Sequence, residues 1–218
     1  PDLSNITLGN SQDFSMKHDG TDTIFNNQTG NFVLRNSADD KDIVFQSDDG
    51  SGGVETYFFL DGSIGGTVVP DGKYIYYGTG FDLSIGHTGS QSVINHAGTG
   101  NLTISTTTDD ADIIFQSDDG SGGVETYFFL DGSSSRTVFP DSKELVFGTD
   151  VNLLIMHNGT DSYIQNYTSG DLYIDQSVAD KDVVLRADNG SGSPTAYLTL
   201  DGSAGTIEAV KDITVTKG

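Results

Sequence analysis

The sequence contains no cysteine, and its 10 lysine and arginine residues face 32 aspartate and glutamate residues. Without cysteine, the chain has no disulfide framework and no thiol chemistry. The formal net charge of −22 argues against nucleic acid and anionic membranes as partners, because both attract basic surfaces. No run of the sequence approaches the roughly 20 apolar residues of a membrane span. We therefore predict neither nucleic-acid binding nor membrane insertion.

Apolar side chains are also scarce, at 34% of the residues. A further 28 residues are glycine, which adds no side chain to a core, so an isolated copy of this chain would have a thin core. We expect identical chains to bury their apolar strands against one another, which makes the chain a homo-oligomer. The acidic surface that remains repels itself, and salt or divalent cations would screen that repulsion.

One stretch of the sequence occurs three times. DIVFQSDDGSGGVETYFFLDGS begins at Asp42 and returns at Asp112 with one substitution, and a more divergent copy begins at Asp182. The step is 70 residues both times. Self-similarity at a fixed period indicates a repeat architecture. A chain built this way is more typical of an extended structural protein than of an enzyme with one unique cleft.

The repeat covers nearly the whole chain, and a glycine marks each boundary. The boundaries divide the sequence into three repeats, at residues 1–78, 79–148 and 149–218. The last boundary opens a fourth period, so we expect the chain to be a segment of a longer shaft. The boundary glycines are Gly9, Gly78, Gly148 and Gly218.

Each repeat alternates apolar and polar residues over short segments, which is typical of strands with one buried face. In the second repeat we predict seven strands, at 74–78, 82–87, 92–96, 101–106, 112–117, 124–130 and 136–139. No stretch has the 3.6-residue period of a helix. Asp-Gly and Asn-Gly pairs, which accept the positive φ angles of tight turns, lie at residues 19–20, 49–50, 61–62, 119–120, 131–132, 158–159, 189–190 and 201–202.

An all-β repeat of this size narrows the possible architectures. A propeller blade uses four strands in about 40–50 residues, and solenoid coils repeat every 20–30 residues. Neither fits a 70-residue unit. We predict an all-β fold in which the repeats stack as an elongated fibre, as an intertwined or side-by-side homotrimer.

The loop SDDGSGG is a candidate calcium site, because Asp48 and Asp118 could offer hard oxygen ligands. The alternative is a glycine-rich hairpin turn in which aspartate sets the geometry. The third copy replaces one of the two carboxylates with Asn189 and keeps the turn residues. A turn tolerates that replacement better than a ligand set does, so we favour the turn and expect no cofactor.

Three histidines occupy one position of the repeat: His18, His87 and His157. If the strand face that carries them points toward a three-fold axis, three imidazoles could meet there and hold a metal ion or an anion. The alternative, which we favour, is a half-buried histidine that bonds a turn at the end of its strand.

The acidic clusters that precede the strand DIVF begin at Asp39, Asp109 and Asp180. Paired carboxylates are the machinery of glycosidases, but three equivalent copies fit a solvated turn better. The sequence contains no nucleophile elbow, no His-Glu-x-x-His and no phosphate-binding glycine loop. We therefore predict no enzymatic activity. The aromatic strand around Tyr57 is a candidate for core packing, interchain packing or sugar stacking.

Several motifs together resemble repeats in tail-fibre and related virion structural proteins of marine bacteriophages, cyanophages among them. The motifs, in order, are FDLSIGHTGS, TSGDLYI, FQSDDGSGG and YFFLDGS. The resemblance spans all three repeats and implies a homotrimeric, β-rich fibre in the virion that takes part in host attachment. Its partners would be its own copies, neighbouring virion subunits and a host surface glycan.

Two alternatives remain open at this point. A cellular, extracellular structural filament or adhesin stalk would show the same repeats. A glycan-binding module is the third possibility. The fibre and the filament both place the protein outside the cell, on a virion or a cell surface.

Overall fold

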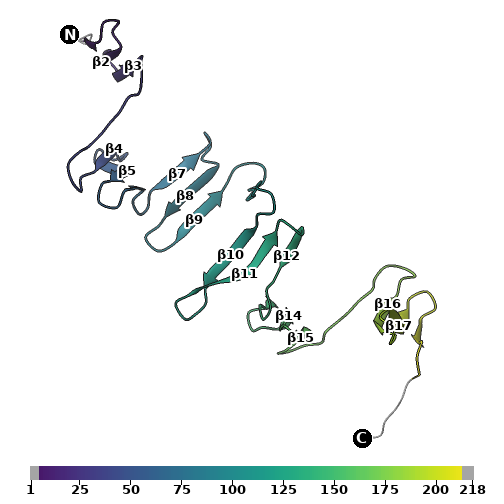
Figure 1. Ribbon diagram of the computed structural model, residues 1–218. Helices are drawn as coiled ribbons and strands as arrows, with labels where there is room; N and C mark the ends of the chain where they lie inside the picture. The colour runs from purple at the N-terminus through teal and green to yellow at the C-terminus, as the bar shows by residue number, and fades with distance from the viewer. Residues whose placement is uncertain (1–4, 213–218) are drawn as a thin grey trace. The chain divides into compact units, whose positions relative to one another are not determined.

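The computed structural model describes residues 5–212, and this part of the chain is all-β (Figure 1). It contains 18 strands and no helix, so none of the described residues forms a helix that could cross a bilayer. The predicted boundary Gly218 lies outside the described residues. The prediction of an all-β fold is confirmed.

The strands form six separate three-stranded antiparallel sheets, each a simple meander. We call the sheets with five-residue central strands short sheets and those with eight-residue central strands long sheets. The short sheets are β1 (Asn5–Leu8), β2 (Phe14–His18) and β3 (Thr23–Asn27); β7 (Tyr74–Tyr77), β8 (Leu83–His87) and β9 (Ser92–His96); and β13 (Leu145–Phe147), β14 (Leu153–His157) and β15 (Ser162–Asn166). The long sheets are β4 (Ile43–Asp48), β5 (Val54–Asp61) and β6 (Gly66–Val68); β10 (Ile113–Asp118), β11 (Val124–Asp131) and β12 (Arg136–Val138); and β16 (Val183–Asp188), β17 (Pro194–Asp201) and β18 (Thr206–Ala209).

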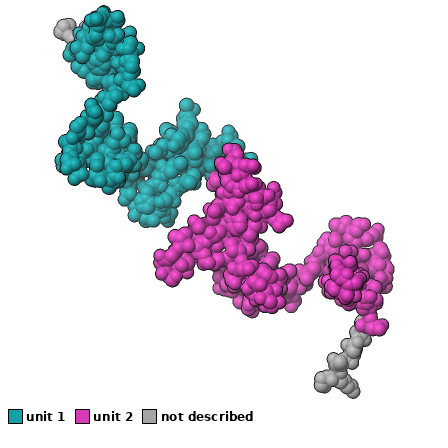
Figure 2. Space-filling view, viewed as in Figure 1, with its two compact units in different colours: residues 1–103 teal, residues 104–218 magenta. Residues whose placement is uncertain are grey.

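The chain divides into two units (Figure 2). Unit 1, Pro1–Thr103, contains β1 to β9, and unit 2, Ile104–Gly218, contains β10 to β18. Short and long sheets alternate along the chain in both units. Each 70-residue repeat therefore supplies one short and one long sheet.

Corresponding long sheets share an irregularity of register. A β-bulge separates Phe45 from Gln46, Phe115 from Gln116 and Leu185 from Arg186. A bulge bends its strand and increases its local twist. The same irregularity thus occurs in the third sheet too, although its side chains differ from those of the first two.

Six of the seven strands predicted for the second repeat are present as β7 to β12. The prediction of a seventh strand, at 101–106, was wrong. These residues form no strand, and neither do the corresponding residues 31–36 and 171–176. Apolar alternation shows that a segment can sit half-buried in a sheet, but a strand also needs a neighbouring backbone. The described part of the chain supplies none here.

The boundary glycines lie inside the short sheets. Gly78 follows β7 immediately, and β7 pairs with β8 on the other side of it. Gly9 and Gly148 follow β1 and β13 in the same way, and all three have φ between 82° and 87°. The glycines thus mark a turn within a sheet, and each meander begins one strand before the boundary that the sequence predicts.

The Asp-Gly pairs serve two different purposes. Glycines such as Gly50 and Gly120 have positive φ, at 80° and 79°, as the turn signals predict. For the glycine of the Asp-Gly pair in the turn that follows the central strand of each long sheet, the predicted positive φ was wrong. A Cβ added there would lie 2.2–2.5 Å from a backbone carbonyl oxygen, so close approach requires glycine. These contacts pair Gly62 with Lys41, Gly132 with Ala111 and Gly202 with Lys181.

Candidate functional site

The described part of the chain buries very little. Among residues 5–212 only Leu154 and Ser84 are buried, with Leu154 at 2% of its full exposure. A well-formed domain of this length would ordinarily bury a substantial set of aliphatic side chains. The sheets are regular, but their faces are mostly uncovered.

The short sheets have an apolar face that is largely exposed, although Met16 and Leu145 on it are half-buried. On each, three apolar residues stand directly opposite one another across the three strands, and the residue on the last strand is 58–63% exposed. The histidine that ends the central strand lies on the same face, two positions further along. We call these three sets the apolar rows: Ile6, Met16 and Phe25; Ile75, Ile85 and Ile94; and Leu145, Ile155 and Ile164.

The long sheets of the first and second repeats pack aromatic residues across their first two strands. Phe45 stacks on Phe58, and Phe115 stacks on Phe128, with ring centroids 4.4 Å apart in both pairs. Such pairs stabilise neighbouring strands beyond the area they bury. Phe58 nevertheless remains exposed on its outer side, so this face too is only partly covered.

The segments at 31–36, 101–106 and 171–176, which we call the linking segments, connect each short sheet to the next long sheet. Figure 1 draws them without arrows. Within the described residues, none of their backbone N–H or C=O groups bonds another backbone group. They carry exposed apolar side chains, among them Leu34, Ile104 and Ile174.

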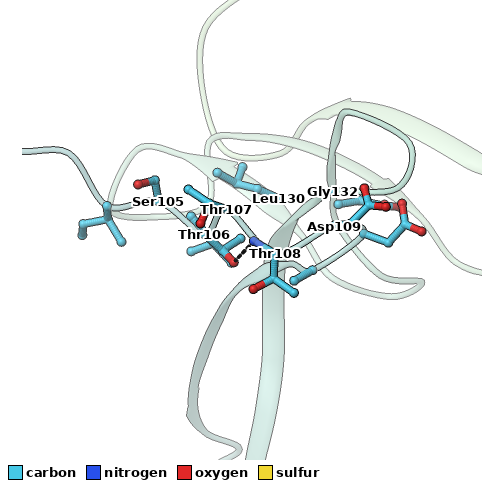
Figure 3. Close-up of a pocket in the computed structure, with 12 residues that line it drawn as sticks. Ser105, Thr106, Thr107, Thr108, Asp109, Leu130 and Gly132 are labelled. Atoms are coloured by element: carbon cyan, nitrogen blue, oxygen red, sulfur yellow. Dashed lines mark hydrogen bonds between the residues drawn. The ribbon is translucent and has the colours of Figure 1, made fainter.

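A shallow hollow lies where a linking segment meets its long sheet. In the second repeat it measures about 370 Å³ and is lined by residues 104–111, by Ile113 and by residues 130–132 (Figure 3). Corresponding residues line hollows of about 390 Å³ in the first repeat and about 460 Å³ in the third. The hollow is thus a feature of the repeat.

The polar groups of this hollow bond the turns around it. Thr108 donates its backbone N–H to the Thr106 hydroxyl at 3.4 Å (Figure 3). Asp131 accepts the Ser133 hydroxyl at 2.7 Å and the Ser134 N–H at 2.9 Å. These bonds, that of Ser133 first, lower the pKa of Asp131 from 3.8 to about 2. A carboxylate stabilised in its ionised form is a poor proton acceptor near neutral pH.

The acidic cluster ahead of each long sheet also has a structural role. Asp112 accepts the N–H of Gly132 at 3.0 Å, which ties the start of β10 to the turn between β11 and β12. Asp42 with Gly62 and Asp182 with Gly202 form the same bond at 3.0 Å. The last aspartate of the cluster is therefore more than a solvated turn residue.

The candidate calcium ligands Asp48 and Asp118 cap the hairpin between the first two strands of their sheets. Each accepts the N–H of the glycine two residues on, Gly50 or Gly120, at 2.9 Å. The next residue, Asp119, accepts the N–H and hydroxyl of Ser121 and the N–H of Gly123 at 2.7–3.0 Å. The geometry is that of the turn we favoured.

The candidate histidines bond the residue directly opposite on the last strand of their short sheet. The Nδ1 atom of His87 lies 3.2 Å from the Ser92 hydroxyl, and that of His157 lies 3.1 Å from the Ser162 hydroxyl. His18 and Thr23 make the corresponding contact at 3.4 Å. The partner is a side-chain hydroxyl on the neighbouring strand and not the turn that we favoured, and of the three histidines His87 alone is half-buried.

No three His, Cys, Asp or Glu side chains of residues 5–212 lie close enough together to hold one metal ion. Within one chain the structure does not unite the candidate ligands His18, His87, His157, Asp48 and Asp118. A ligand set shared between copies stays a prediction.

The sequence analysis missed one contact that recurs. Lys73 pairs with Glu55 at 2.5 Å and lies 5.2 Å from the centre of the Tyr57 ring. Lys143 makes the same contacts with Glu125 and Tyr127, at 2.6 Å and 5.5 Å. The Glu55 bond raises the pKa of Lys73. The signal was present, because lysine and glutamate recur at fixed positions of the first two repeats.

The chain matches no protein-family model, no curated protein and no solved structure. The resemblance to phage fibre repeats therefore remains an expectation that rests on the motifs quoted above.

Proposed function

We propose that this chain is a structural fibre protein, the shaft of a bacteriophage tail fibre, which assembles as a homotrimer and contributes to host attachment. The observation that supports it best is the apolar row, exposed at the same place on all three short sheets. Contiguous exposed apolar surface marks an interaction site. Further copies of the chain, aligned in register, would cover all three rows at once.

The trimeric state rests on the resemblance to phage fibres, whereas the need for further copies rests on the uncovered faces. Stacking of the repeats into a shaft is inferred from their tandem order along the chain. Neighbouring virion subunits would continue the shaft, and a host surface glycan would be its distal target.

The proposal is tested by two variants that add the same charge to opposite faces of one strand. Ile94→Asp places a carboxylate in an apolar row, whereas Asn95→Asp places one on the other face of β9. We expect negative-stain images of the wild type and Asn95→Asp to show thin fibres, and images of Ile94→Asp to show none. Fibres of unchanged length in Ile94→Asp would contradict the proposal. An antibody against the chain should label the tail fibres of phage particles.

One observation favours glycan binding as a second candidate function. Tyr76 and Phe81 are exposed and form an edge-to-face pair with ring centroids 5.1 Å apart, and Tyr74 lies 5.9 Å from Tyr76. Exposed aromatic faces stack on sugar rings. A glycan array on which wild type binds and Tyr76→Ala does not would support this function, and an array without hits would leave the structural role alone.

A further inference from the structure

We propose that the linking segments are interchain β-strands, each of which pairs its backbone with a strand of a second copy of this chain. The inference rests on the proposed function, because it requires other copies. It specifies which residues make the contact between copies, and that backbone hydrogen bonds form it.

The backbone of the linking segments is unsatisfied in the described chain. Residues 171–176 make only side-chain bonds there: Gln176 accepts the N–H of Val178 at 3.0 Å, and the Tyr173 hydroxyl bonds Asp171 at 3.3 Å. A row of free N–H and C=O groups on an extended segment is a template for pairing with another strand.

The side chains of the linking segments alternate between apolar and polar, as in a strand with one buried face. Their apolar side chains are nevertheless exposed. Leu172 and Ile174 alternate with Tyr173 and Asp175, yet Leu172 is 46% and Ile174 67% exposed. Leu102 with Ile104 and Phe32 with Leu34 occupy the same positions and are exposed as well. In the third repeat the hollow beside the segment presents Val183 and Leu200 next to Ile174, so an added strand would meet apolar surface.

Charge and period favour a second copy as the partner. The 18 residues of the three segments contain Arg35, Asp171 and Asp175 as their charged residues, a net charge of −1 within a chain of −22. Two copies that repel each other through their acidic surfaces meet little repulsion here. A partner for all three segments must also offer its strands at 70-residue steps, and a copy in register does so.

Hydrogen exchange measured together with molar mass tests the inference. In the assembled protein we expect amides of 31–36 and 171–176 to exchange roughly 100-fold or more slowly than in an unstructured peptide. A trimer with unprotected segments would overturn the inference and leave the proposed function intact. A monomer with unprotected segments would overturn both. Protection in a monomer would also overturn the inference, because the pairing would then lie within one chain.

Paired variants of one segment give a second test. Leu172→Asp combined with Ile174→Asp should weaken association about 100-fold or more, because the apolar side chains lose their burial. The control, Asp171→Asn combined with Asp175→Asn, should associate at least as tightly as wild type, because it removes like charges. Circular dichroism should show β1 to β18 intact in both, since neither change touches them, with no more than the short interchain strand lost in the aspartate variant. Equal association of the two variants would contradict the interchain strand.

Discussion

The long sheets of the second and third repeats, β10–β12 and β16–β18, differ in side chains but share their backbone. The aromatic pair Phe115 and Phe128 is replaced by Leu185 and Leu198 at the same register. The bond between Gln116 and Thr126, 3.1 Å long, has no counterpart, because Arg186 and Ala196 stand there. The bulge and the hairpin nevertheless remain.

Other residues are the same in both sheets. Tyr127 and Tyr197 each donate a hydroxyl to the carbonyl of the aspartate at the hairpin, Asp118 or Asp188, at 3.0 Å. The aspartate-to-glycine bond that anchors the following turn is 3.0 Å in both sheets. The backbone therefore depends on tyrosine, aspartate and glycine at a few positions, whereas the aromatic pair adds stability.

The largest effect is expected where the two sheets are identical. Gly132→Ala places a Cβ 2.4 Å from the Ala111 carbonyl oxygen, and Gly202→Ala places one 2.2 Å from that of Lys181. Both should lose about 1–3 kcal/mol of unfolding free energy, as overpacked sites do. Gly66→Ala is the control, since its nearest neighbour lies 3.6 Å away. Denaturant unfolding measures all three, and tolerance of Gly132→Ala would remove close approach as the reason for glycine.

A somewhat smaller loss is expected at the hairpin. Gly120 has φ of 79° and Gly190 of 87°, and no atom lies near enough to obstruct a side chain. Valine at either site should cost about 1–2 kcal/mol through backbone strain alone. The same unfolding experiment should find the two losses equal. A loss of stability in Gly120→Val alone would show that the two hairpins differ in energy although their backbone geometry is similar.

Acid should weaken the turns, and more in the second repeat than in the third. The Ser133 hydroxyl bond lowers the pKa of Asp131 to about 2, and the Ala204 N–H bond lowers that of Asp201. Because these pKa values lie below the unfolded value, the stabilisation is complete above about pH 4 and is lost as pH falls toward 2. Ser121 also lowers the pKa of Asp119, whereas Asn189 cannot titrate.

Melting temperatures between pH 7 and pH 2 measure this effect. They should be nearly flat from pH 7 to 5 and should fall below about pH 4. Asp119→Asn, which copies the third repeat, should reduce the fall. An acid transition that Asp131→Asn and Asp119→Asn both leave unchanged would show that other carboxylates control it.

The smallest effect concerns the ion pair. Glu125→Gln breaks the contact with Lys143, and we expect a loss of less than about 1 kcal/mol because the pair is partly exposed. In the third repeat Thr195 stands in place of this glutamate, and a lysine from a different repeat position, Lys211, lies 5.9 Å from the Tyr197 ring centre. Thr195→Glu should raise the free energy of unfolding by a similar amount. In 1 M salt this gain should disappear.

The strands could be predicted from the sequence because alternation and turn residues are local properties. The Asp-Gly pairs at 49–50 and 119–120 identified hairpins correctly. The reason for glycine at position 132 could not be predicted, because it is the nearby carbonyl oxygen of Ala111, a residue distant in the sequence. The linking segments were predicted as strands because a pattern cannot say where a pairing backbone will come from. The candidate ligands were found by type, but their bonds to Gly120 and Ser92 depend on the folded hairpins.

The central claim is that other copies of this chain cover its apolar rows, and molar mass in solution tests it most directly. Sedimentation equilibrium at micromolar concentration should give about 69 kDa for the wild type, three times 23.1 kDa. Ile94→Asp should shift the mass toward 23.1 kDa. A wild-type chain with full strand content and a mass of 23.1 kDa would contradict the account.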